Sequence, residues 1–104
     1  MYKILFSTVL FNTPVDQLKS LIESIQSLHM TLSDKFPSKY QLELFIVDNN
    51  SSNSIDLAFL KLNSYDFKIY FNVSDTNLGY GGGHNYNYSN IRPSLNKWFI
   101  PINP

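Results

Sequence analysis

The stretch from Leu44 to Val47 constrains the fold of this chain most strongly. It is a run of four apolar residues, followed at once by Asp48 and then by a polar turn from Asn49 to Ser52. An unbroken apolar run of this length is typical of a strand covered on both faces, as in a parallel sheet. Ligands of open α/β sheets bind just outside the carboxyl ends of the strands. Asp48 is therefore predicted to lie at the ligand-binding edge of such a sheet.

Strand and helix patterns alternate along the rest of the chain. Strands are predicted at 3–11, 41–47, 67–73 and 97–102, and helices at about 14–32, 53–60 and 82–90. Thr13 is a predicted N-cap with Pro14 at the first helical position, and Asn53 is predicted to cap the second helix. The order predicts one domain over 1–104 with a three-layer α-β-α, Rossmann-like fold. Its parallel sheet should have strand order 3-2-1-4.

The composition excludes several classes of function. Acidic and basic residues balance at eight each among 104 residues, which argues against a nucleic-acid partner. The absence of cysteine excludes disulfides, thiolate zinc sites and cysteine nucleophiles. No stretch approaches the roughly 20 apolar residues of a membrane helix, and the N-terminus does not resemble a secretory signal. We expect a cytoplasmic protein.

All four glycines fall between Ser74 and Asn85, in the loop after the third predicted strand. The glycines do not match the dinucleotide-binding fingerprint, because His84 stands where its third glycine would be and because that fingerprint follows the first strand. No Gly-Lys-Ser or Gly-Lys-Thr is present, so the sequence also lacks the P-loop that binds nucleoside triphosphates. The glycines favour close backbone approach to a flat ligand. The alternative is a flexible turn without a ligand.

Two side chains at this edge suggest specific chemistry. A carboxylate only accepts hydrogen bonds, so Asp48 could accept the ring N–H of uracil, thymine or guanine, which cytosine and adenine lack. Alternatively, Asp48 caps the turn that follows it, and position alone does not separate these two roles. His84, at a predicted helix start, could contact a phosphate or a base edge, whereas His29 is predicted to be structural or partly exposed. His84 has no obvious partners for a metal site.

Three segments carry a resemblance to a known family. They are Val-Leu-Phe-Asn at 9–12, Phe-Ile-Val-Asp-Asn-Asn-Ser at 45–51 and Asn-Leu-Gly-Tyr-Gly-Gly-Gly-His-Asn at 77–85. Together they resemble family-2 glycosyltransferases of the GT-A fold, most closely the rhamnosyltransferase-like enzymes of bacterial polysaccharide synthesis. The resemblance implies that these segments hold the nucleotide of a UDP-, dTDP- or GDP-sugar donor. The implied nucleotide-binding residues are Val9, Phe11, Asn12, Asp48, Asn50, Gly79, Gly81, Gly83, His84 and Asn85. Phe11 falls where the family often has a tyrosine that stacks on the base.

The same resemblance implies that the chain is the donor-binding half of a longer enzyme without its acceptor half. That enzyme would transfer a sugar, rhamnose for example, to a glycan or lipid-linked acceptor at the inner face of the membrane, in polysaccharide or lipopolysaccharide synthesis. In family members a metal-binding aspartate follows the fourth strand, so the acid that holds Mg²⁺ or Mn²⁺ is expected beyond Pro104. No tightly bound metal, catalytic residue or activity is therefore expected of this chain alone. The alternative is a non-catalytic nucleotide-binding or interaction module.

The last predicted strand, 97–102, lies at an edge of the sheet in the predicted order. Edge strands present unpaired backbone groups, so a homodimer through this edge is expected to be accessible. Pro101 cannot donate a ladder hydrogen bond, and its place inside the strand predicts a bulge.

Overall fold

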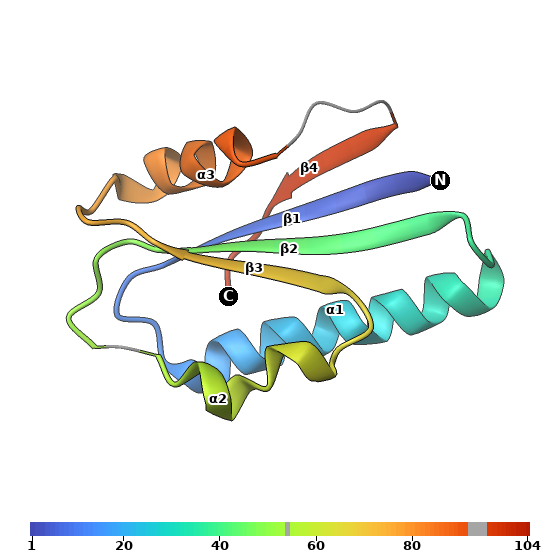
Figure 1. Ribbon diagram of the computed structural model, residues 1–104, viewed down its shortest axis with the longest axis horizontal. Helices are drawn as coiled ribbons and strands as arrows, with labels where there is room; N and C mark the ends of the chain where they lie inside the picture. The colour runs from blue at the N-terminus through green and yellow to red at the C-terminus, as the bar shows by residue number, and fades with distance from the viewer. Residues whose placement is uncertain (54, 92–95) are drawn as a thin grey trace.

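The structure is a computed structural model, and it describes residues 1–53, 55–91 and 96–104 (Figure 1). Strands and helices alternate along the described chain. In order they are β1 (Tyr2–Leu10), α1 (Val15–Lys35), β2 (Tyr40–Asp48), α2 (Leu57–Leu60), the 3-10 turn η1 (Leu62–Ser64), β3 (Lys68–Val73), α3 (Gly79–Ser89) and β4 (Lys97–Pro101). The predicted alternation of strands and helices is confirmed.

The strands form one parallel sheet in the order β3-β2-β1-β4, as predicted. Figure 1 shows α1 and α2 on one side of this sheet and α3 on the other. The chain therefore has the predicted three-layer α/β architecture. Because the strands are parallel, the loops after β1, β2 and β3 all leave from one edge.

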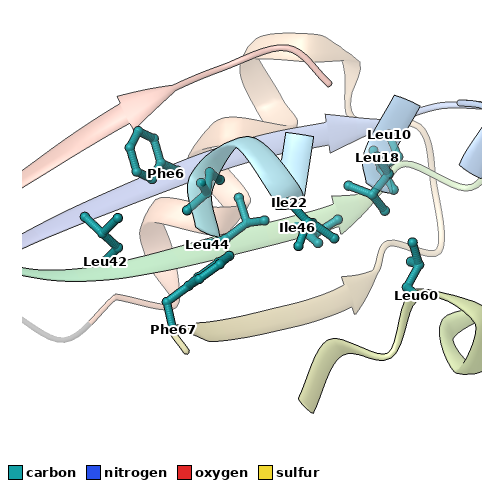
Figure 2. Packing of buried hydrophobic residues seen from close by; sticks show 10 residues of the cluster. Phe6, Leu10, Leu18, Ile22, Leu42, Leu44, Ile46, Leu60 and Phe67 are labelled. Atoms are coloured by element: carbon teal, nitrogen blue, oxygen red, sulfur yellow. The ribbon is translucent and has the colours of Figure 1, made fainter. Parts of the chain in front are cut away.

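The hydrophobic core lies between the sheet and α1. Side chains alternate between the two faces of a strand, and Phe6 of β1 and Leu44 of β2, which are register partners, both point toward α1. From the helix, Leu18, Ile22 and Ile25 enter the same cluster at helical spacing, as Figure 2 shows for most of its members. These three side chains of α1 thus belong to the core, whereas Leu28 on the same helix is 39% exposed.

Helix α1 is amphipathic rather than apolar throughout. Residues such as Asp16, Glu23 and Lys35 are exposed, while its stripe faces the sheet. In the parts of the chain that the structure describes, no helix is long and apolar enough to cross a membrane.

The predicted helix starts need correction. The hydroxyl of Thr13 accepts a hydrogen bond from the Phe11 N–H at 3.2 Å, so it stabilises the loop and does not cap α1, which follows Pro14. The second helix is capped by Asp56, whose carboxylate accepts from the Phe59 N–H at 3.2 Å. Asn53 is therefore not its cap. At α2 a second polar residue nearby offered the better geometry, whereas no side chain caps α1.

Two other predicted boundaries were wrong. Helix α1 continues to Lys35, past the predicted end near residue 32, because nothing in the sequence breaks it before Pro37. Helix α3 begins at Gly79, three residues earlier than the predicted Gly82. Gly79 takes a φ of +75°, which turns the chain into the helix directly after the loop.

The predicted bulge at Pro101 is also wrong. The register of β4 with β1 runs without interruption from Lys3↔Lys97 to Ser7↔Pro101. Ile102 donates its N–H to the Ser7 carbonyl at 2.8 Å, so the backbone groups of even-numbered residues face β1. The nitrogen of Pro101 consequently points away from β1, toward the open edge, where no ladder donor is needed.

We predict that Leu44→Ala lowers the free energy of unfolding by about 2–5 kcal/mol, because Leu44 is fully buried between α1 and the sheet. That is a large share of the roughly 5–15 kcal/mol that stabilises a domain of this size. The matched control is Leu57→Ala on α2, where the side chain is 41% exposed, and its expected cost is within about 0.5 kcal/mol. Urea denaturation measures both; equal losses would contradict the assigned core.

Candidate functional site

The loops at the carboxyl edge of the sheet surround a cleft of about 430 Å³. Its lining comes from the end of β1, the loop before α1, the end of β2, the start of α3 and the C-terminal residues. These residues are Val9, Phe11, Thr13, Gln17, Asn49, Asn77, Gly79, Tyr80, Asn103 and Pro104. The predicted convergence of the loops at this edge is confirmed.

Two aromatic rings at this cleft are open to solvent. Phe11 is 52% exposed and Tyr80 is 54% exposed, and they come from the β1–α1 loop and the first turn of α3. Apolar surface that gathers at a cleft can mark a ligand site. Both rings line the same cleft, so a flat apolar ligand bound there could contact either of them.

Asp48 lies at the carboxyl end of β2, as predicted, and it caps the following turn. Its Oδ2 accepts from the Ser51 N–H at 3.2 Å, and its Oδ1 accepts from the Ser51 hydroxyl. The carboxylate is 9% exposed behind this turn. The carboxylate can accept further hydrogen bonds, so a contact with a nucleotide base is compatible with this cap and stays a prediction.

The loops after β1 and β2 are joined by side-chain hydrogen bonds. Asn12 donates its backbone N–H to the Ser51 hydroxyl at 2.8 Å, and its Oδ1 accepts from the Ser52 N–H at 2.9 Å. Asn12 and Asn50 have φ of 52° and 63°, which asparagine tolerates better than most residues. Asn12 therefore holds the two loops together, while Asn50 is exposed in the turn.

Asn49, which the sequence analysis missed, attaches the glycine loop to the sheet. Its Oδ1 accepts from the Leu78 N–H at 3.1 Å, and its Nδ2 donates to the Gly79 carbonyl at 2.9 Å. The side chain is 1% exposed. The alternation of side chains along a strand could have identified Asn49. Asp48 points to the α1 face, so its neighbour Asn49 points to the opposite face, where α3 lies.

The first turn of α3 has open backbone groups at the cleft. Gly79 donates its N–H to the Asn77 side chain at 2.8 Å, and the N-cap residue Leu78 makes no side-chain cap. The next N–H groups, of Tyr80 and Gly81, belong to the first turn, which has no intrahelical acceptor. A Cβ at Gly81 would meet nothing within 4 Å, so this turn is sterically open.

His84 is held beneath α3 by a buried network. Asn87 donates its Nδ2 to the Ser7 hydroxyl at 2.8 Å, and this hydroxyl lies 2.7 Å from Nδ1 of His84. Ser7 can donate its own proton to Nδ1, which leaves the ring proton on Nε2. Nε2 of His84 and Oδ1 of Asn87 are buried without a hydrogen-bond partner among the described residues. Burial also lowers the pKa of His84, so the neutral ring is favoured.

Asn87 was not predicted either, although it is fully buried. Its Nδ2 also lies 3.2 Å from the carbonyl oxygens of Thr8 and Phe45, so one amide connects α3 to both β1 and β2. Its signal in the sequence is helical spacing: it follows His84 by three residues and Gly83 by four, on one face of the helix.

The predicted site residues thus separate into groups. Val9, Phe11 and Gly79 line the cleft together. Asp48, Asn12 and Asn50 form the adjoining turn and its contacts, and Gly81 is exposed in the first turn of α3. Gly83 and His84 are buried under α3, whereas Asn85 is exposed on that helix. The structure brings the cleft residues, the turn residues and Gly81 to one edge of the sheet. Gly83 instead packs against Val9.

Within the described parts of the chain, no group of three or more histidine, aspartate or glutamate side chains is placed to hold a metal ion. The metal-binding acid that the family resemblance implies stays a prediction.

Comparison of the chain with protein-family models, curated proteins and solved structures gave no match. The functional assignment therefore depends on the cleft, its exposed rings and the groups around α3. The family resemblance noted in the sequence remains a hypothesis.

We predict that Gly83→Ala destabilises the fold by about 1–3 kcal/mol, because its Cβ would lie 2.7 Å from both Cγ atoms of Val9 and push α3 off β1. The matched control is Gly81→Ala in the same helix, where the space is open and a gain of about 0.5–1 kcal/mol is expected. Chemical denaturation measures both. Adding Val9→Ala to Gly83→Ala should recover part of the loss; strict additivity would contradict the contact.

We also predict that stability falls as the pH falls through about 6.5, the unfolded pKa of histidine. Because the folded pKa of His84 is lowered, the unfolded chain takes up the proton first, and the stabilisation is complete only above that pH. His84→Gln should flatten this dependence between pH 7.5 and 5.5, measured by urea denaturation. His29→Gln on α1 is the control and should retain it. An unchanged pH dependence in His84→Gln would be the contrary result.

Proposed function

We propose that this chain is the donor-binding part of a family-2 glycosyltransferase and holds the nucleotide of a nucleoside-diphosphate sugar in the carboxyl-edge cleft. The observation that carries the proposal is the pair of exposed rings, Phe11 and Tyr80, beside the first turn of α3, whose N-cap residue makes no side-chain cap. A nucleotide needs an apolar surface for its base and donors for its phosphates. This cleft offers both within one site.

The base is expected to stack on Phe11. A ring that is half exposed at a cleft presents a face on which a base can stack, and such stacking contributes about 1–3 kcal/mol per base. Asn49 and Asn77, also in the lining, bring amide groups to the same cleft. Asp48, one residue from Asn49, could accept the ring N–H of a uracil or thymine that reaches past Ser51.

The phosphates are expected at the start of α3. The first-turn N–H groups of a helix attract anions, and the open space at Gly81 allows an oxygen to approach the backbone closely. The buried Nε2 of His84 supplies a further unpaired donor on the same helix. Tyr80 lies against His84 with ring centroids 4.4 Å apart, so a ligand that moves Tyr80 would change the surroundings of that nitrogen.

The proposed reaction moves a sugar, rhamnose for example, from the nucleotide to a glycan or lipid-linked acceptor in the cytoplasm. The groups described above bind and orient the donor, and no base for the acceptor hydroxyl is assigned among them. A divalent metal held outside these residues would neutralise the diphosphate leaving group. A nucleotide-binding module without catalysis would share the binding properties, so sugar transfer by a longer form of the chain distinguishes the two.

We predict that UDP and dTDP bind this chain with a Kd on the order of 1 mM, because no metal compensates the diphosphate. Phe11→Ala should weaken binding about 5- to 100-fold by removing the stacking surface. Phe59→Ala, a ring on α2 with 48% exposure, is the matched control and should leave the affinity unchanged. Isothermal titration measures all three proteins. Equal affinities for the two variants would argue against a base at Phe11.

A separate pair of variants distinguishes the two roles of Asp48. If its carboxylate contacts the base, Asp48→Asn should weaken UDP binding, with a loss of up to about 1.5–3 kcal/mol, and CDP should bind less well than UDP. Ser51→Ala removes the hydroxyl that bonds Asp48 and accepts from the Asn12 N–H, but it keeps the carboxylate and the backbone N–H that bonds it. It should therefore lower stability by roughly 1 kcal/mol without loss of affinity. If both variants lose only stability and CDP binds as UDP does, Asp48 is a turn cap alone.

A further inference from the structure

A second groove lies on the α3 face of the sheet, over β1, β2 and β3. It has a volume of about 570 Å³. This volume falls within the range of about 300–1,000 Å³ that small-molecule sites occupy. The groove shares no lining residue with the nucleotide cleft, so the two can bind different ligands independently.

The groove carries charged side chains that a packed sheet face lacks. Where α1 covers the sheet, β1 and β2 present apolar residues such as Phe6 and Leu44. On the groove side the same two strands present Lys3 and Glu43, and Lys68 of β3 is the register partner of Glu43. Charged groups at these positions suit a polar ligand better than the packing of a further helix.

Glu43 brings a nearly buried carboxylate to the groove. The residue is 6% exposed. Its Oε2 accepts a hydrogen bond from Nε2 of Gln41 at 3.1 Å and lies 3.9 Å from Nζ of Lys3. Its Oε1 has no hydrogen-bond partner among the described residues and remains available as an acceptor. A carboxylate in this state favours a ligand that donates hydrogen bonds, as hydroxyl groups do.

The charges of the groove favour an anion. Two lysines and one glutamate line it, which leaves one positive charge uncompensated. Lys3 is paired with Glu43, whereas the exposed Lys68 makes no ion pair within the described parts of the chain. An anionic group of a ligand is therefore expected at the ammonium group of Lys68.

Tyr70 and two amides complete the lining. The Tyr70 ring is 38% exposed and stacks on Phe45 with ring centroids 4.7 Å apart, which holds it in place. The face of an aromatic ring is electronegative and attracts C–H bonds, which carry a partial positive charge. Asn72 and Asn90 also line the groove, and Nδ2 of Asn90 donates to the Tyr86 carbonyl at 3.0 Å, so its Oδ1 is left as an acceptor.

We propose that this groove binds an acidic carbohydrate. Its hydroxyl groups would donate to Oε1 of Glu43 and to the amides, its carboxylate would lie at Lys68, and the C–H face of a sugar ring would pack on Tyr70. An aromatic acid matches Lys68 and Tyr70 but has no hydroxyl for Glu43. A neutral sugar leaves Lys68 without a counter-charge, and a nucleoside diphosphate places several negative charges beside Glu43. This site does not depend on the proposed function.

Two matched probes test the proposal, cellotriose and its oxidised form, in which glucuronate replaces each glucose. Titration is followed by amide chemical shifts. The oxidised probe should shift the amides of Glu43, Lys68 and Tyr70, with a Kd on the order of 1 mM. Cellotriose should bind at the same amides at least about threefold more weakly, because it lacks the charge that pairs with Lys68.

Three variants assign the contacts. Lys68→Gln should weaken binding of the oxidised probe about 3- to 10-fold and leave cellotriose unchanged, and it should fold normally because Lys68 is exposed. Lys35→Gln, on the exposed end of α1, is the charge-matched control and should bind both probes as the unaltered chain does. Tyr70→Ala should weaken both probes about 3- to 10-fold by removing the ring.

Several outcomes would overturn the proposal. Unchanged chemical shifts at about 10 mM of either probe would do so, as would equal affinities for the two probes. So would changes centred on Phe11 and residues 79–81, because the sugar would then lie in the nucleotide cleft. Displacement of the oxidised probe by an equal concentration of benzoate, an aromatic acid without hydroxyl groups, would reject a carbohydrate site. None of these results would alter the affinity measured for UDP.

Discussion

The structure depends on the burial of β2 on both faces. Even-numbered residues of this strand, such as Leu44, form the core with α1, whereas odd-numbered residues face α3. The alternation continues past the end of the strand, where Asp48 caps a turn and Asn49 binds the glycine loop. One strand therefore fixes the core, the adjoining turn and the position of α3. A shift of register by one residue would exchange all of these roles.

The attachment of α3 is polar, in contrast to that of α1. Its contacts with the sheet include the hydrogen bonds of Asn87, the Ser7–His84 pair and the close approach of Gly83 to Val9. Tyr88 adds one aromatic contact, with Phe99 of β4. Each buried polar group that lacks a hydrogen-bond partner lowers the stability of the fold, and Nε2 of His84 is one such group among the described residues. Polar attachment makes the position of the first turn of α3 specific, which suits a site that must bind a polar ligand.

The sequence predicted the strands and helices from apolar periodicity, which depends on burial alone. Their alternation, with right-handed crossovers, then predicted the strand order and the edge at which the loops meet. It failed where several polar residues competed for one role. Asp56 and not Asn53 caps α2, and Thr13 bonds its own loop. Asn49 and Asn87 were missed because the partners of a buried amide are backbone groups distant in the sequence. The nucleotide contacts proposed for Asn12 and Gly83 compete with structural roles that only the packing reveals.

The central claim is that a nucleotide binds at the carboxyl edge of the sheet. The described chain also has a groove of about 570 Å³ on the open part of the α3 face, beside Lys3, Glu43 and Tyr70, which offers a competing location. Mapping amide chemical-shift changes during titration with UDP distinguishes the two. The account predicts the largest changes at Phe11, Asn49 and residues 79–81. Changes concentrated around Lys3, Glu43 and Tyr70, or no changes at millimolar UDP, would contradict it.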